Sequence, residues 1–155
     1  MLFRSAGIEF YGQSLITQPA RVKNEASLVE ALVAGAMDAI KFAMTNPDEA
    51  LAIFLKANEE VAMTATSKEF VRIGLGLSNL HNYCPEVLEH GYGYVDMAKV
   101  RTQAELILKY GVSGNVTPPN LDELFTNRFA GKLKLTDAEK ATVQKNIEPF
   151  RKYVS

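Results

Sequence analysis

The sequence has little of what nucleic-acid binding, disulfide formation or phosphate chemistry requires. Its one cysteine, Cys84, excludes an internal disulfide and a cysteine-ligated metal cluster. The formal net charge is -1 and no run of basic residues occurs, so the sequence lacks the electrostatic signature of a nucleic-acid or anionic-membrane partner. Glycine-rich phosphate-binding motifs are also absent. We therefore expect no nucleic-acid partner.

Long apolar runs are missing as well. Glu30, Asp38 and Lys41 interrupt the most apolar region, so no segment approaches the ~20 apolar residues that a membrane-spanning helix needs. The 155 residues are nevertheless 47% hydrophobic and 23% charged, which is typical of a globular domain long enough to bury a core.

The strongest pattern is a pair of apolar helical repeats within residues 24–57. In the first repeat, apolar residues recur every three or four positions, which is the period of one helix face. These residues are Leu28, Val29, Leu32, Val33, Ala36, Met37, Ile40 and Met44. We expect Asn46 to cap a second helix that begins at Pro47, with Glu49 completing a capping box. The apolar side chains that this second helix should bury are Leu51, Phe54 and Leu55.

The remainder of the chain also favours helices. Helical patterns cover residues 59–80, 85–90, 96–110, 121–129 and the region after Thr136. We expect Asp96 to cap one of these helices and Gly111 to end it in the left-handed conformation. The spacing of Thr136 and Glu139 predicts a capping box that opens the last helix, which Pro149 ends or kinks.

One β element is expected before these helices. Residues 8–17 alternate around Gly12 with β-favouring apolar side chains, which predicts one strand or two short ones. A lone strand leaves backbone groups unpaired, so its neighbours must come from missing chain or from a partner. The predicted fold is therefore mostly α as it stands, with one or two short strands.

The first residues do not look like the start of a natural domain. Residues 1–6 carry one charge and no apolar core long enough for a signal peptide, and Leu2-Phe3-Arg4-Ser5 correspond to a translated sequencing adapter. We expect residues 1–6 to be a non-native start and residues 7–155 to be an incomplete domain.

Four segments, taken in order, carry a family resemblance. They are Gly7-Ile8-Glu9-Phe10-Tyr11-Gly12, residues 24–43 with Asn46-Pro47-Asp48-Glu49-Ala50, Gly93-Tyr94-Val95-Asp96 with Gln103, and Thr126-Asn127-Arg128-Phe129. Together they resemble the C-terminal half of ABC transporter substrate-binding proteins of the NMT1/THI5-like family, related to thiamine-pyrimidine synthesis and to nitrate, sulfonate and taurine uptake. The similarity covers about residues 7–130.

The resemblance implies that the chain is a fragment of a two-lobed α/β fold of the periplasmic-binding-protein type (type II), with the ligand between the lobes. Residues 7–17 would be the strand that returns to the first lobe, and the helices after it would cover the sheet of that lobe. Most ligand contacts would then lie in the missing N-terminal half. The implied partners are a small-molecule ligand and a permease. The implied location is periplasmic or extracytoplasmic, with the signal peptide lost along with the missing half.

Five candidate ligand-binding residues follow from this resemblance. Glu9 and Tyr11 would border the cleft, where an aromatic ring can stack on a planar ligand while a polar group bonds its edge. The alternative is that Tyr11 only packs against its neighbour. Gly12 would be a hinge, or else a strand bulge. Tyr92 and Tyr94 would line the cleft mouth, or else pack half-buried before a helix.

Three residues that could ligate a metal ion lie within ten positions, namely His81, Cys84 and His90. No pair among them has the spacing that converges on one ion, and a further ligand is missing, so the sequence argues against a metal site. A cysteine–histidine nucleophile pair is disfavoured because no orienting motif surrounds Cys84.

The predicted function is that of a non-enzymatic solute-binding component of an ABC importer. It would capture a pyrimidine or other vitamin precursor, or a sulfonate- or nitrate-like anion, without a cofactor, and deliver it to the permease by closing over it. The lack of a basic cluster favours the neutral heterocycle. Two alternatives stay open: an enzyme of the same fold resembling thiamine-pyrimidine synthase, whose cysteine-rich motif this chain lacks, and a small helical interaction domain.

Overall fold

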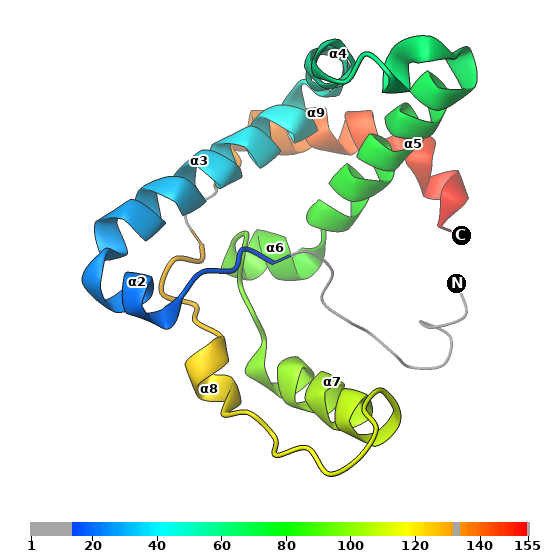
Figure 1. Ribbon diagram of the computed structural model, residues 1–155. Coiled ribbons are helices and arrows are strands. Elements are labelled where there is room, and N and C mark those ends of the chain that lie inside the picture. The colour runs from blue at the N-terminus through cyan, green and yellow to red at the C-terminus, as the bar shows by residue number, and fades with distance from the viewer. Residues whose placement is uncertain (1–13, 132–133, 155) are drawn as a thin grey trace. The chain divides into compact units, whose positions relative to one another are not determined.

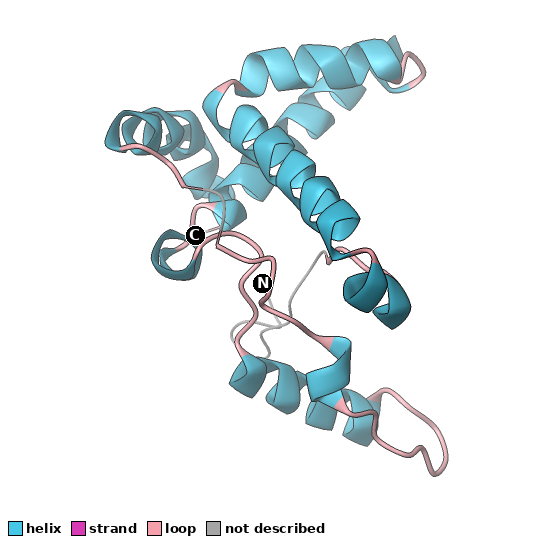
Figure 2. Cartoon of the chain, turned by 90° about the vertical axis from the view of Figure 1, so that its left-hand side faces the viewer, coloured by secondary structure: helices cyan, strands magenta, loops and turns pink. Residues whose placement is uncertain are grey.

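The computed structural model describes residues 14–131 and 134–154, and this part of the chain is helical (Figure 1). The α-helices are α2 (Pro19–Asn24), α3 (Ala26–Thr45), α4 (Pro47–Ala57), α5 (Ala65–Asn82), α6 (Pro85–His90), α7 (Met97–Tyr110), α8 (Leu121–Leu124) and α9 (Asp137–Ile147). Two 3-10 helices, η1 (Val61–Met63) and η2 (Glu148–Tyr153), complete the set. Loops join them, and Figure 2 draws no strand within the described ranges. The prediction of a mostly α chain is confirmed.

The predicted β element lies largely outside the described residues. Of residues 8–17, only 14–17 are described, and they have no regular secondary structure. The expected strand over residues 8–13 stays a prediction.

The chain divides into two units. The first combines the chain up to Val33 with Gly93–Ala130, and the second combines Ala34–Tyr92 with the chain from Gly131 onward. Helix α3 runs through the boundary between Val33 and Ala34.

The core of the second unit forms where α3 and α9 meet. Met44, Val143 and Ile147 are almost completely buried there. Partly buried apolar side chains pack around them: Ile40, Leu80, Tyr83 and Leu135. Burying aliphatic side chains in this way stabilises the fold by roughly 1.5–3 kcal/mol each.

Two asparagines satisfy the last carbonyl groups of α3. The side-chain amide of Asn79 on α5 donates to the Ala43 oxygen at 2.9 Å, and that of Asn146 on α9 donates to the Met44 oxygen at 3.0 Å. Asn79 is buried, and the carbonyls at a helix end have no partner within the helix. Residue 47 would normally donate to the Ala43 oxygen but is a proline without an N–H. The two amides therefore fix α5 and α9 on the end of α3.

The predicted single stripe of α3 divides into two faces. Val29, Met37 and Met44 are buried, whereas Leu28 is 46% exposed and Leu32 65% exposed. The prediction of one buried stripe is wrong for Leu28 and Leu32, whereas Val33, Ala36 and Ile40 are partly buried beside the three buried side chains.

Helix α4 begins at Pro47 as predicted, but the expected capping box is wrong. Asn46 makes no side-chain cap, and its amide instead donates to the Thr45 hydroxyl at 2.9 Å. Of the three apolar residues that α4 was expected to bury, Leu51 and Leu55 are partly buried, whereas Phe54 is 45% exposed, so the prediction is wrong for Phe54.

The caps of α7 and α9 form as predicted, but the end of α7 differs. The Asp96 carboxylate accepts from the Ala98 N–H at 2.8 Å, and Thr136 and Glu139 form the reciprocal capping box of α9. Gly111 follows α7 with φ -104°, so the predicted left-handed ending is wrong.

A glycine of α5 receives the ring of Phe150. A Cβ on Gly76 would overlap the Phe150 ring, which is buried, and the Arg72 guanidinium lies 5.3 Å from the centre of that ring. The absence of a side chain at Gly76 therefore lets η2 lie directly on the backbone of α5, where the cation adds to the packing.

We expect Gly76→Ala to lower the free energy of unfolding by about 1–3 kcal/mol, because the added methyl group forces the Phe150 ring out of its position. Gly74→Ala is the matched control, since no atom lies within 4 Å of the position its Cβ would take. On helix propensity alone it should raise stability by up to about 1 kcal/mol. Urea unfolding of both variants measures the difference, and equal effects would contradict the packing role of Gly76.

An ion pair ties the start of α9 to α3. The Lys41 ammonium lies 2.8 Å from the Glu139 carboxylate and donates to the Lys134 carbonyl oxygen at 3.3 Å. The hydrogen bond from Lys41, helped by the backbone N–H of Thr136, lowers the pKa of Glu139 to about 2. Below its ordinary pKa of 4.5 the carboxylate would protonate in an unfolded chain while staying charged in the folded one.

The contribution of Glu139 to stability should therefore be complete above pH 4.5 and disappear as the pH falls toward 2. We expect Glu139→Gln to flatten the decline of the melting temperature over this range, measured by circular dichroism. Glu105→Gln, on the exposed surface of α7, is the control and should keep the wild-type decline. The same slope for both variants would contradict the role of the ion pair.

Candidate functional site

Three of the five predicted ligand-binding residues lie outside the described part of the chain. Glu9, Tyr11 and Gly12 precede residue 14, so their assignment stays a prediction. Tyr92 and Tyr94 are described and belong to different units, Tyr92 to the second and Tyr94 to the first.

Tyr92 is half-buried, and its hydroxyl already has a partner. The hydroxyl donates to the side-chain oxygen of Asn82 at the end of α5, at 2.8 Å. Burial, and then the nearby Cys84 thiol, raise the pKa of Tyr92, so its hydroxyl stays protonated and keeps donating. This geometry favours the packing alternative for Tyr92 over a role at a cleft mouth, and the ligand role stays a prediction.

Next to Tyr94, two of the segments behind the family resemblance come together. The Asn127 side chain accepts from the Val95 N–H at 2.8 Å and donates to the Val95 carbonyl oxygen at 2.9 Å. One amide thus pairs both polar groups of one residue, as a neighbouring strand would. It joins residues 93–96 to residues 126–129 within the first unit, next to the half-buried Tyr94.

Arg128 extends this arrangement to a third segment. Its guanidinium donates to the Val22 carbonyl oxygen in α2 at 3.3 Å, while Phe129 beside it is buried. On the surface of the same unit, Arg101 of α7 pairs with Asp122 of α8 at 2.9 Å. The sequence did not indicate that Asn127 and Arg128 would hold these segments, because their partners are backbone groups far along the chain.

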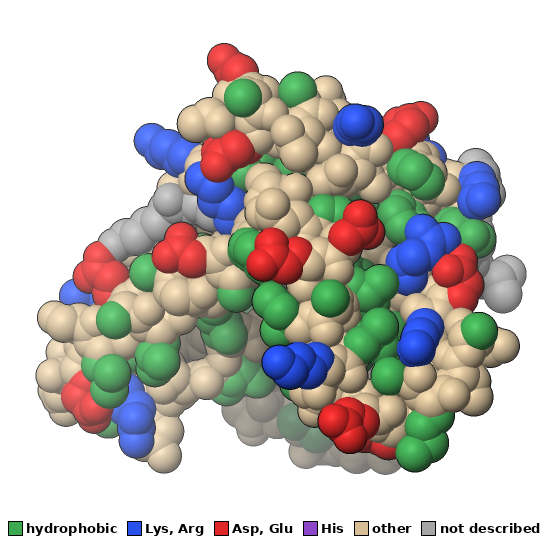
Figure 3. Space-filling view, turned by 90° about the horizontal axis from the view of Figure 1, so that it is seen from above, with side chains coloured by type: hydrophobic (Ala, Val, Ile, Leu, Met, Phe, Trp, Pro, Cys, Tyr) green, Lys and Arg blue, Asp and Glu red, His purple; other side chains and the backbone are tan. Residues whose placement is uncertain are grey.

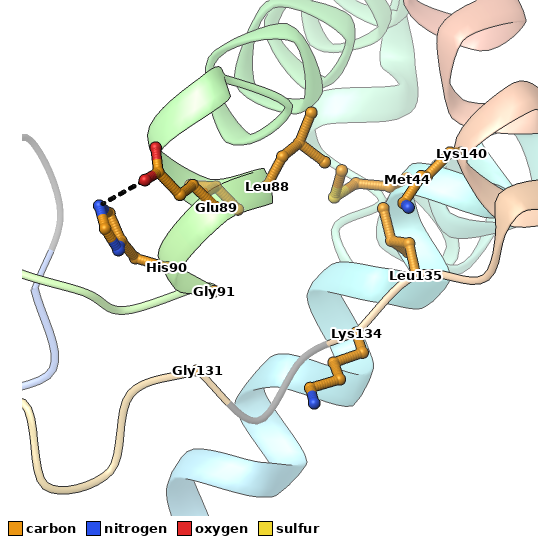
Figure 4. A pocket seen from close by; sticks show the side chains of 10 residues that line it. Met44, Leu88, Glu89, His90, Gly91, Gly131, Lys134, Leu135 and Lys140 are labelled. Carbon is orange, nitrogen blue, oxygen red and sulfur yellow. Dashed lines mark ion pairs between the residues drawn. The ribbon is translucent and has the colours of Figure 1, made fainter.

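A pocket of about 300 Å³ lies in the second unit. Its lining residues come from α3, α6, α9 and the segment before α9: Met44, Val87, Leu88, Glu89, His90, Gly91, Gly131, Lys134, Leu135 and Lys140. Figure 4 shows Met44, Leu88 and Leu135 pointing toward one another, so the pocket has an apolar floor.

The charged groups of this pocket do not converge. Glu89 and His90 lie 3.9 Å apart and point away from the apolar floor (Figure 4). Lys140 is paired with Asp137 at 3.0 Å. A catalytic or anion-binding site needs polar groups directed at one point, and this pocket does not provide them.

The histidines and the cysteine considered as metal ligands make other contacts. The Nδ1 atom of His81 lies 2.7 Å from the Leu77 carbonyl oxygen, one turn earlier in α5, and Cys84 has a free thiol. Within residues 14–131 and 134–154, no group of three or more His, Cys, Asp or Glu side chains could hold a metal ion. Over the same ranges, no helix combines the length and apolar character needed to cross a lipid bilayer.

Comparison with known proteins gives a match to a family model. No curated protein and no solved structure matches the chain significantly. A family model described as NMT1/THI5 like matches residues 1–50, which contain α2, α3 and the start of α4. The segments at residues 93–96 and 126–129 lie beyond this match, so their part of the resemblance stays a prediction. Over residues 1–50 the predicted family resemblance is confirmed, and the chain is consistent with a fragment of an NMT1/THI5-like protein.

Proposed function

We propose that the chain is part of the solute-binding component of an ABC importer. The observation that carries this proposal is the match of residues 1–50 to the NMT1/THI5-like family, which supports a substrate-binding or related role. The whole protein would capture a small polar or heterocyclic solute outside the cytoplasm and deliver it to a membrane permease. Binding would close two lobes over the solute, so that the closed form docks on the permease.

The composition of α3, which lies inside the matched region, supports an incomplete domain. Successive residues of a helix are rotated by about 100°, which places Leu28, Leu32 and Ala39 on a face beside the buried one. The charged residues Glu30 and Asp38 occupy the remaining side. An apolar face of a helix normally packs against another part of the protein. In α3 one of these faces has no cover within the described residues, as expected if a missing part of the protein packs there.

Further apolar side chains are exposed elsewhere. Figure 3 shows apolar side chains at the surface between acidic and basic ones. Large apolar residues more than half exposed in the second unit are Ile53, Met63 and Phe70. The exposure of so many apolar groups in a chain of this size supports the proposal that further protein covers them.

A second candidate comes from the same family match. The family consists mostly of binding proteins, but THI5 itself is a synthase. The synthase alternative requires a cysteine-rich motif, and this chain contains only Cys84. We therefore favour the binding protein. The lack of a basic cluster in the sequence favours a neutral heterocycle, such as a pyrimidine, over a sulfonate- or nitrate-like anion.

The coding sequence directly upstream in the genome tests the proposal. A signal peptide or a lipoprotein cysteine followed by the first lobe is expected. A cysteine cluster would favour the synthase, and a natural start at Met1 would favour an independent helical domain. The recovered full-length protein, tested by calorimetry with a hydroxymethylpyrimidine, taurine and nitrate, should bind the pyrimidine most tightly. Failure to bind any of the three would contradict the proposed solute class.

The exposed face of α3 gives a prediction for residues 1–155 alone. This chain should bind a hydrophobic dye such as ANS, because part of its apolar surface has no cover. Leu28→Ser combined with Leu32→Ser should lower the dye fluorescence while the helix content by circular dichroism stays unchanged.

Asp38→Ser, on the charged side of the same helix, is the matched control and should leave the fluorescence unchanged. A monomer that binds no dye would count against an incomplete domain.

A further inference from the structure

The pocket of the second unit has an apolar floor that reaches the core. Met44, Leu88 and Leu135 point toward one another across this floor (Figure 4). Met44 belongs to the buried core, whereas Leu88 on α6 is 44% exposed. Leu88 therefore leaves much of its apolar surface in contact with water. An apolar ligand in the pocket would cover that surface, which favours binding.

Close packing and hydrogen bonds hold the walls of this pocket. A Cβ on Gly91 would overlap the backbone of Gly131, and the Gly131 N–H donates to the Tyr92 carbonyl oxygen at 3.2 Å. The Lys41 ammonium donates to the Lys134 carbonyl oxygen at 3.3 Å, which ties the segment before α9 to α3. Walls held in this way do not have to order when a ligand enters, so less entropy is lost on binding.

The volume of the pocket limits the size of its ligand. The pocket measures about 300 Å³, and a methylene group occupies roughly the 30 Å³ that a water molecule takes in the liquid. The space therefore accepts about ten methylene groups. Because the charged side chains do not converge on one point, the burial of apolar surface has to supply most of the affinity.

The charges around the pocket favour a negatively charged ligand. Lys134 and Lys140 line the side formed by α9 and the segment before it, whereas Glu89 on α6 points away from the floor (Figure 4). Lys140 pairs with Asp137, whose side chain is 98% exposed. An exposed pair within one helix turn contributes little, so the Lys140 ammonium is available to another anion. Two ammonium groups attract a carboxylate without fixing it at one point.

We propose that this pocket binds a medium-chain aliphatic carboxylate such as decanoate. The aliphatic chain lies on Met44 and Leu135 and covers Leu88, while the carboxylate stays in water near Lys134 and Lys140. The site does not rest on the function proposed above, which concerns polar solutes. All its residues belong to the second unit, and of the five only Met44 lies within the family match.

Methyl-labelled methionine locates the ligand in residues 1–155. In ¹³C-methyl NMR spectra, decanoate below its micelle concentration should shift the Met44 resonance. The resonance of Met63, which is 80% exposed on η1, should stay in place. Met44→Leu assigns the first resonance and Met63→Leu the second. Equal shifts of both resonances, or no shift of the Met44 resonance, would overturn the proposal.

Leu88→Ser should weaken decanoate binding about tenfold, because the aliphatic chain loses apolar contact in the pocket. Leu124→Ser is the matched control, since Leu124 is also an exposed leucine but lies on α8 in the first unit. It should leave the affinity unchanged, as should Leu28→Ser combined with Leu32→Ser on α3. Calorimetry measures the affinities and circular dichroism the helix content. An equal loss for the Leu88 and Leu124 variants would contradict the site.

The two lysines can be tested without changing the apolar floor. Lys134→Gln combined with Lys140→Gln should weaken decanoate binding about threefold. Lys145→Gln, on α9 but outside the pocket lining, is the matched control and should have no effect. The unchanged chain should bind decylammonium more weakly than decanoate. Equal affinities for these two amphiphiles would overturn the assignment of a carboxylate.

Discussion

The packing of the second unit depends on the hydrogen bonds that the last carbonyl groups of α3 receive. Pro47 removes the N–H that would have bonded the Ala43 carbonyl, and buried Asn79 supplies a donor in its place. Asn146 does the same for Met44 from another helix. A buried carbonyl without a partner costs about 1–3 kcal/mol, so both helices must hold their positions for the end of α3 to remain buried. The apolar core around Met44 is then packed between helices that hydrogen bonds have already oriented.

The sequence predicted the features that depend on nearby residues. The helical conformation of α3, the start of α4 at Pro47, the Asp96 cap and the capping box at Thr136 each involve residues within one or two turns, and all are confirmed. The Asn46 cap was wrong because the side-chain NH2 of Asn46 donates to the Thr45 hydroxyl, and its side-chain oxygen accepts no N–H of α4. The spacing of the residues does not show which of these two local hydrogen bonds forms.

Hydrogen bonds between residues far apart in the sequence could not be predicted. Asn79 is unfavourable inside a helix by intrinsic propensity, and this was the available signal for its role, but nothing in its neighbourhood names Ala43 as its partner. The same holds for Asn127, which pairs with Val95 from 32 residues away. The same is true of the candidate site. Tyr92 was predicted to contact a ligand, but its hydroxyl donates a hydrogen bond to the Asn82 side chain.

The polar and apolar side chains of the described pocket are not arranged as in a site for a polar ligand. In the described pocket the apolar side chains converge and the charged ones diverge, which is the reverse of a site that orients a polar solute (Figure 4). The apolar surface that lacks cover, by contrast, is on α3, the helix inside the family match. A surface of this kind suits packing against further protein rather than capture of a polar solute. If the proposed function holds, the apolar face of α3 therefore serves the packing of the whole protein, and the ligand contacts have to come from other residues, with Glu9, Tyr11 and Tyr94 among the predicted ones.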